Sequence, residues 1–172
     1  MESLEYMYKK ILVSLDGSKL AECVLPHVDG FIAACRVETI VFVRVVKPVS
    51  FLSITQNVDI ESEPKEYKNM LKNLDQIEEK RTVLAAKYLD AIVGRSKQDD
   101  IEYKTKILVG KISKSIIKYA ESNEIDLILM ATHGRSGANR WLHGRMADKL
   151  LRSSKIPILI IRPEGIIKGH SI

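Results

Sequence analysis

Two short stretches of the sequence combine residue types suited to ligand binding. The first is Asp16-Gly17-Ser18, which directly follows the apolar run 10–15. If that run is a strand, the Asp16 carboxylate lies at the mouth of a sheet and can accept hydrogen bonds from amino or hydroxyl groups of a ligand. The plainer alternative is a turn followed by a helix N-cap, because Asp, Gly and Ser are all common at those positions.

The second stretch, residues 130–148, joins an apolar run to a basic helix. Gly134 and Gly137 allow the backbone to approach a ligand closely, and Gly144 stands where the helix begins. Free N–H groups at a helix N-terminus attract anions, so the stretch predicts a phosphate-binding loop and helix. An ordinary glycine-containing connection before a solvated basic helix is the alternative, since glycine spacing alone is a weak signal. The nearby cations are Arg135, Arg140, Arg145 and Lys149.

The elements that position these stretches alternate along the chain. Predicted strands cover 10–15, 39–46, 101–109, 126–131 and 156–161, and predicted helices cover 19–34, 67–93, 113–122 and 145–153. This alternation predicts an α/β fold of the Rossmann-like kind, with a single five-stranded parallel sheet and helices on both faces. Ligands of such sheets bind beyond the carboxyl ends of the strands, where the strand order switches.

Apolar spacing predicts which helix faces are buried. For helix 19–34, which Pro26 should kink or divide, the face comprises Leu20, Val24, Val28, Phe31 and Ile32. For helix 67–93 it comprises Met70, Leu74, Ile77, Arg81, Leu84, Tyr88, Leu89 and Ile92. Cys23 and Cys35 both fall on the first helix, about 18 Å apart, which is too far for a disulfide. Both are therefore expected to be reduced thiols.

Composition and charge limit the class of protein. The chain has 172 residues, 45% hydrophobic and 28% charged, which predicts one domain over 1–172, with a core at 8–163, a loop at 47–66 and a tail at 164–172. The net charge of +5 is mild and no dense basic block is present, so nucleic acid is not an expected partner. No apolar run could span a bilayer and no leader pattern is present, so a cytoplasmic protein without membrane contact is expected.

The sequence resembles the universal stress protein family at both candidate stretches. Ala131-Thr-His-Gly134, followed by nine residues and Gly144, is similar to the family pattern G-x-x-G, nine residues, G-[S/T]. Residues 9–18, Lys-Lys-Ile-Leu-Val-Ser-Leu-Asp-Gly-Ser, look like the family's first strand and its adenine-contacting Asp. The resemblance covers residues 8–163 and implies a sheet in the order 3-2-1-4-5, an adenine-nucleotide alpha-hydrolase-like fold.

The resemblance also implies an adenine nucleotide, ATP or AMP, as ligand, with Mg²⁺ as a companion of ATP. The residues that end the first strand, with the backbone near Val45, would take the adenine and ribose. Residues 130–134 would line the ribose and phosphates, and the start of helix 145–153 would meet the distal phosphates. The implied site residues are Ser14, Leu15, Asp16, Val45, Met130, Ala131, His133, Gly134, Gly144, Arg145, Met146 and Ala147.

Two residues depart from the family pattern. Ala131 stands at its first glycine, and Arg145 stands where the family has a Ser or Thr that contacts phosphate. Arg145 either clamps a phosphate with its guanidinium or fills the phosphate site, alone or paired with Asp148. The first outcome predicts a stress-response or regulatory protein that binds an adenine nucleotide. The second predicts a dimeric interaction module without ATP, acting on an unknown protein partner.

An enzyme is the third and weakest hypothesis. Efficient phosphoryl transfer requires a metal-binding carboxylate and a positioned nucleophile, and the phosphate stretch offers only Asp148. The sequence therefore predicts no dedicated catalysis, although slow ATP hydrolysis stays open.

A homodimer is predicted through the strand 156–161, which is apolar almost without interruption. An exposed hydrophobic edge strand associates unless it is covered. The tail 164–172 could instead fold back over this edge.

Overall fold

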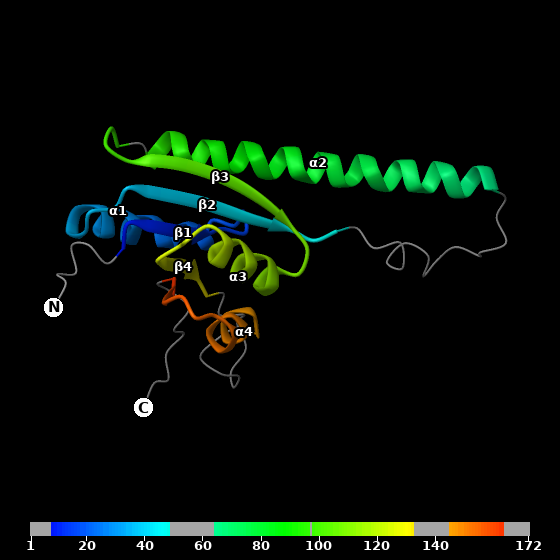
Figure 1. The fold of residues 1–172 in the computed structure, drawn as a ribbon. Helices are drawn as coiled ribbons and strands as arrows, with labels where there is room; N and C mark the ends of the chain where they lie inside the picture. Colours follow the sequence, from blue (N-terminus) through cyan, green and yellow to red (C-terminus); the bar gives the residue numbers. More distant parts are fainter. Residues whose placement is uncertain (1–7, 49–63, 97, 133–144, 164–172) are drawn as a thin grey trace, which may run out of the picture.

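The computed structural model describes residues 8–48, 64–96, 98–132 and 145–163 of the chain. Strands and helices alternate along it, as the sequence predicts (Figure 1). The strands are β1 (Lys10–Ser14), β2 (Thr39–Val46), β3 (Glu102–Val109), β4 (Leu127–Ala131) and β5 (Ile158–Ile161). The helices are η2 (Ala21–Val24), α1 (Leu25–Ala34), α2 (Pro64–Ser96), α3 (Ile112–Ser122) and α4 (Arg145–Ser153).

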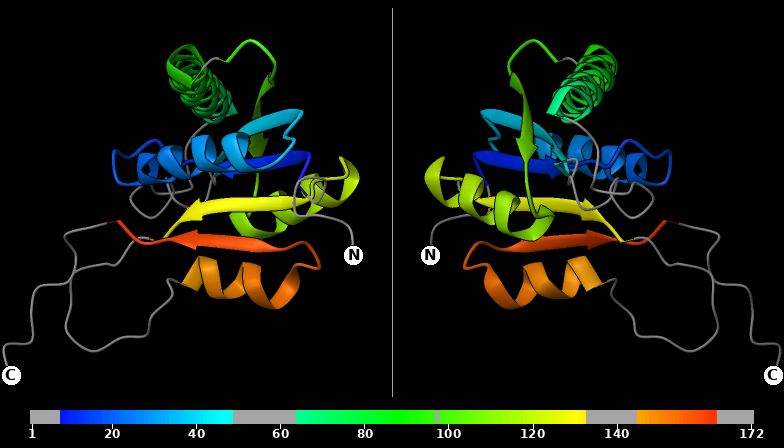
Figure 2. Two further views of the ribbon diagram at one scale, coloured as in Figure 1. Left: turned by 90° about the vertical axis from the view of Figure 1, so that its left-hand side faces the viewer. Right: turned by 90° about the vertical axis from the view of Figure 1, so that its right-hand side faces the viewer.

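The five strands form one parallel sheet in the order β3-β2-β1-β4-β5, which confirms the predicted fold. β1 lies in the centre, with β2 on one side and β4 on the other (Figure 2). The strands that flank β1 are rich in Ile, Val and Leu because both of their faces are covered. The order switches between β1 and β4, so the carboxyl ends of these two strands are where a ligand is expected.

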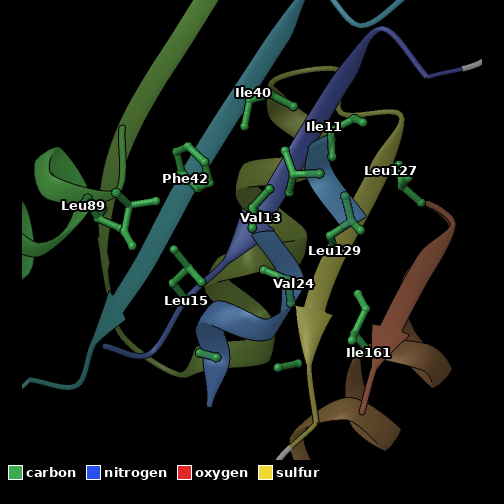
Figure 3. Packing of buried hydrophobic residues seen from close by; sticks show 14 of the residues in the cluster. Ile11, Val13, Leu15, Val24, Ile40, Phe42, Leu89, Leu127, Leu129 and Ile161 are labelled. Atoms are coloured by element: carbon green, nitrogen blue, oxygen red, sulfur yellow. The ribbon is translucent and has the colours of Figure 1, made fainter. Parts of the chain in front are cut away.

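Alternating side chains of the sheet enter two hydrophobic clusters. Ile11, Val13 and Leu15 of the β1 segment pack with η2, α1 and the C-terminal half of α2 (Figure 3). Leu12 of β1 packs on the other face, with α3 and α4. Each strand therefore presents successive residues to opposite helix layers. This alternation decides which side of the sheet each candidate site residue faces.

The segment predicted as helix 19–34 is two helices. A 3-10 helix, η2, covers Ala21–Val24, and α1 begins at Leu25 with Pro26 in its first turn. Pro26 has no N–H to donate, so it is tolerated at the start of α1 and not in the interior of one long helix. The predicted buried face is wrong at Leu20, which is 44% exposed. Cys23 lies in η2 and Cys35 caps α1, and both are free thiols.

The predicted buried face of α2 is partly wrong. Leu74, Leu89 and Ile92 are buried, but Ile77 and Leu84 are 39% and 63% exposed. Ala85, which follows Leu84, is fully buried in its place. Neighbouring residues on a helix point about 100° apart, and here Ala85 is on the side that packs while Leu84 is turned outward. The small Ala85 side chain therefore packs in the core. The face of α2 that packs is rotated about the helix axis relative to the face predicted from its large apolar residues.

The two edges of the sheet differ in chemistry. β3 carries three exposed polar residues near its middle, Lys104, Thr105 and Lys106. β5 is entirely apolar, and its Leu159 is 36% exposed. Charged residues on an edge strand oppose pairing with another sheet, whereas an apolar edge favours it. β5 begins at Ile158, two residues later than predicted.

Candidate functional site

The turn after β1 places Asp16 at the carboxyl edge of the sheet. The main-chain N–H of Leu15 donates to the Val43 carbonyl at 2.9 Å, which extends the pairing of β1 and β2 by one residue. The Asp16 carboxylate accepts from the main-chain N–H of Ser18 at 2.9 Å, and the Ser18 hydroxyl accepts from that of Ala21 at 3.1 Å. The turn of the plainer interpretation is therefore present, but the predicted N-cap is not, because η2 is preceded by Leu20 without a side-chain cap hydrogen bond. The exposed Asp16 carboxylate stands at the carboxyl edge of the sheet.

The end of β4 lies beside this turn. Ser14 is in register with Met130 of β4, and Ala131 is in register with Ile161 of β5. The main-chain N–H of Thr132 donates to the Ile161 carbonyl at 2.8 Å, so β4 is held in the sheet to its last residue. Met130, Ala131 and Thr132 are all buried. The chain thus leaves the sheet next to Asp16 with its backbone fixed.

Strand alternation places the candidate residues on both sides of the sheet. Met130 belongs to the cluster on the α3 and α4 side, and Val45 packs against that cluster. Ser14 follows the same alternation as Leu12 and faces that side too. Leu15 and Ala131 face α1 and α2 instead. Their side chains belong to the core, so any contact they make with a ligand at the edge involves the backbone.

Helix α4 begins at Arg145, as the sequence predicts. It joins the end of β4 to the start of the parallel strand β5, so its N-terminus lies at the carboxyl edge (Figure 2). Ala147 and Leu150 anchor it in the core at 2% and 0% exposure. The first N–H groups of a helix have no partner within it and attract anions. The carboxylate of Asp148 pairs with Nε of Arg152 at 3.0 Å, one turn further along.

The structure therefore brings together Ser14, Leu15, Asp16, Val45, Met130 and Ala131, with α4 anchored beside them by Ala147. Arg145 and Met146 are the first two residues of α4. His133, Gly134 and Gly144, with the cations Arg135 and Arg140, lie outside the described residues.

Sequence reasoning missed Arg44 and Tyr88, which lie beside the Asp16 turn. The guanidinium carbon of Arg44 stands 5.3 Å from the centre of the Tyr88 ring. It also stands 2.6 Å from the point that a Cβ would occupy at Gly17, whose φ is +89°. A charged residue near the end of the otherwise apolar run 39–46 is the signal that could have indicated Arg44.

The electrostatics around Tyr88 involve both strands and helices. Burial raises the pKa of Tyr88 to about 12; the carboxylates of Glu22 and Asp16 raise it as well, and the nearby arginines oppose them. The Tyr88 hydroxyl is buried without a hydrogen-bond partner in the part of the chain that the structure describes. Glu22 binds Arg95 of α2 at 3.0 Å, which ties η2 to the same helix.

Metal-binding clusters and membrane-spanning helices are both absent from the described ranges. No group of three or more His, Cys, Asp or Glu side chains in those ranges could hold a metal ion. Among the helices described, none has the length and apolarity that crossing a membrane requires.

The sheet order and the helix layers define an α/β protein with a Rossmann-like parallel sheet. Residues 7–162 match the profile of the universal stress protein family. The chain belongs to this family, as its two motif-bearing stretches predict.

Known relatives agree with this assignment. Universal stress protein MJ0577 of Methanocaldococcus jannaschii is 29% identical over 167 residues, covering 92% of this chain and 98% of the relative. A solved structure of MJ0577 superposes with a TM-score of 0.71 at 25% identity, covering 92% and 99% of the two chains.

Two further solved structures share the fold and hold nucleotides. A universal stress protein in complex with cAMP has a TM-score of 0.61 at 16% identity, covering 92% of this chain and 99% of the other. A family member from Arabidopsis thaliana with AMP bound has a TM-score of 0.57 at 12% identity, covering 95% and 97%.

Proposed function

We propose that this protein binds an adenine nucleotide at the carboxyl edge between β1 and β4, in a stress-response or regulatory role. The observation that carries the proposal is a convergence of three segments. The Asp16 turn, the buried end of β4 and the N-terminus of α4 all lie at the carboxyl edge of the sheet, where the strand order switches between β1 and β4. The nucleotides bound to two structural neighbours support adenine as the base.

The two ends of the proposed site suit the two ends of a nucleotide. The Asp16 carboxylate can accept hydrogen bonds from adenine or ribose, and the backbone near Val45 lies on the adjacent strand. The N–H groups and dipole at the start of α4 suit the phosphates. His133, Gly134 and Gly144 would complete the phosphate end. For ATP, Mg²⁺ would be bound mainly through phosphate oxygens, as this ion commonly is.

Arg145 is the residue that decides between the two predicted outcomes. A guanidinium offers a fork of donors that fits phosphate oxygens. Pairing with Asp148 would close the site, but Arg145 would then have to share that carboxylate with Nε of Arg152, which lies 3.0 Å from it. This pair supports the phosphate-clamp interpretation of Arg145. We propose no dedicated catalysis, and a metal-dependent turnover near about 10 s⁻¹ would contradict that part of the proposal.

A dimeric interaction module is the second candidate function. The observation that favours it is the apolar outer edge of β5, where Leu159 is partly exposed, in contrast to the lysines on β3. In this interpretation the pairing surface would serve an unknown protein partner, and Arg145 would prevent ATP binding.

Calorimetric titration with ATP, ADP and AMP tests the proposal. Wild-type protein is expected to bind, and Arg145→Ser should weaken ATP binding by about 1.5–3 kcal/mol, the usual contribution of a charged hydrogen bond. Lys155→Ser is the matched control, because it removes an exposed positive charge that follows the C-terminal end of the same helix and should leave affinity unchanged. If wild type binds nothing and Arg145→Ser binds ATP, the interaction module is the better account. Mass spectrometry of the purified protein would identify a co-purifying nucleotide.

A further inference from the structure

The turn at residues 16–18 packs against the side chain of Arg44, a residue that belongs to neither of the two motif-bearing stretches. We propose that Arg44 is the positioning residue of the adenine end, holding the 16–18 turn so that the Asp16 carboxylate is presented at the sheet edge. Its role toward a ligand rests on the proposed nucleotide binding, whereas its role toward the turn can be measured without a ligand.

The contact between Arg44 and Gly17 carries the proposal. Three atoms of the guanidinium, its carbon Cζ and the nitrogens Nη1 and Nη2, lie 2.6–2.8 Å from the point where a Cβ of residue 17 would be. The guanidinium therefore occupies the space that any other residue at this turn would need. Gly17 also has φ +89°, a conformation that L side chains rarely adopt. The turn is thus shaped to accept the arginine.

The Arg44 side chain also contacts the Tyr88 ring. Their separation of 5.3 Å, from guanidinium carbon to ring centre, lies within the range of a cation–π contact. Phe42, two residues earlier and on the same strand face, points toward Leu89 of α2 (Figure 3). No hydrogen bond or ion pair to another described residue fixes the Arg44 guanidinium, so the ring and the turn are what position it. Arg95, by contrast, is bound to Glu22.

Two features link this packing to the proposed ligand site. The turn's hydrogen bonds join the Asp16 carboxylate to the Ser18 amide, and the Ser18 hydroxyl to the Ala21 amide. A shift of Gly17 therefore moves the Asp16 carboxylate relative to η2. Arg44 also directly precedes Val45, whose backbone is the second proposed adenine contact. Arg44 thus contacts the turn that presents Asp16, the first proposed adenine contact. It also belongs to β2, the strand that carries Val45, the second proposed contact.

The first experiment measures amide hydrogen exchange by NMR in the ligand-free protein. Arg44→Met keeps an unbranched stem but removes the planar charge, and should speed exchange of the Ser18 amide about twofold to fivefold, the size expected for losing a cation–π contact. Arg44→Lys should exchange at a rate between wild type and Arg44→Met, because an ammonium is still attracted to the ring but lacks the planar fork that packs against Gly17. Tyr88→Phe keeps the ring and should match wild type. Arg152→Met, the charge-matched control on α4 at the other face of the sheet, should leave Ser18 unchanged. Unaltered exchange in Arg44→Met would overturn the proposal.

The second experiment asks whether Arg44 acts through Asp16. ATP affinity is measured for Arg44→Met, for Asp16→Ala and for the double variant. Each single variant should lose affinity, and the double variant should lose no more than Asp16→Ala alone, because both changes remove the same contact. Fully additive losses would show that Arg44 acts independently of the turn and would overturn the positioning role.

The outcome with wild type separates this inference from the proposed function. If wild type binds no adenine nucleotide, the proposed function fails and the ligand-related part of the Arg44 role fails with it. The exchange rates still decide whether Arg44 holds the turn. If wild type binds ATP and Arg44→Met binds equally well, the proposed function stands and the Arg44 inference is overturned.

Discussion

Replacing Gly17 by alanine should destabilise the protein for two separate reasons. With φ at +89°, a residue other than glycine costs about 1–2 kcal/mol. The new Cβ would also lie 2.6 Å from Cζ of Arg44, so the guanidinium has to leave the Tyr88 ring, a loss of about 0.5–1 kcal/mol. The sum is about 1.5–3 kcal/mol, which for a domain of this size lowers Tm by about 5–10 °C in calorimetric or circular-dichroism melting.

The chain offers a matched control and a way to separate the two contributions. Gly30 lies inside α1, and a Cβ added there would meet nothing within 4 Å, so Gly30→Ala should raise stability by about 0.5–1 kcal/mol. In an Arg44→Ala background, Gly17→Ala should cost only the backbone contribution of about 1–2 kcal/mol. If Gly17→Ala melts at the wild-type temperature, both the conformational and the contact arguments are refuted.

Three further predictions concern stability, pH and assembly. Asp126→Ala should lower the free energy of unfolding by about 2–3 kcal/mol in chemical denaturation, because its carboxylate accepts from the main-chain N–H groups of Lys9 and Lys10 at 3.0 and 2.8 Å. The control Glu38→Ala, which removes an exposed ion pair with Lys9, should lower it by only about 0.2–0.5 kcal/mol. Equal losses in the two variants would contradict the argument. Burial raises the pKa of Tyr88 from 10 to about 12, so the stabilising contribution of the neutral phenol is full below pH 10 and is lost as the pH rises through 12. Tyr88→Phe should therefore reduce the decline in the free energy of unfolding between pH 10 and 12. A decline equal to that of wild type would count against this prediction. Light scattering should give a dimer for wild type and a monomer for Leu159→Lys, whereas monomeric wild type, with or without the tail 164–172, would refute pairing through β5.

The elements that could be predicted from the sequence are those with strong local signals. The β-branched run 39–46 coincides with β2, and the predicted helix 145–153 coincides with α4. The face of α2 could be predicted only in part, because Leu89 and Ile92 are buried as expected but Ala85 packs in place of the more apolar Leu84. That choice depends on tertiary packing, which is not visible in local periodicity.

The candidate site also combines features that local sequence patterns predict with features that depend on tertiary packing. The position of Asp16 at the edge of the sheet could be predicted, because a strand followed by Asp-Gly-Ser is a local pattern. The contact of Arg44 with Gly17 and Tyr88 could not, because it joins residues far apart in the chain that meet only when β2 and α2 pack together. An arginine in an apolar strand shows that something must accommodate its charge, but not which residues do.

The length of α2 affects how the size of this protein should be measured in solution. Its 33 residues extend about 50 Å, whereas a compact chain of 172 residues is about 40 Å across. The helix runs past the sheet on one side (Figure 1). A rod attached to a compact body increases hydrodynamic friction more than it increases mass, so the protein should elute early from a sizing column. A monomer could then be mistaken for a dimer by elution volume, whereas sedimentation equilibrium, which is independent of shape, would give its true mass.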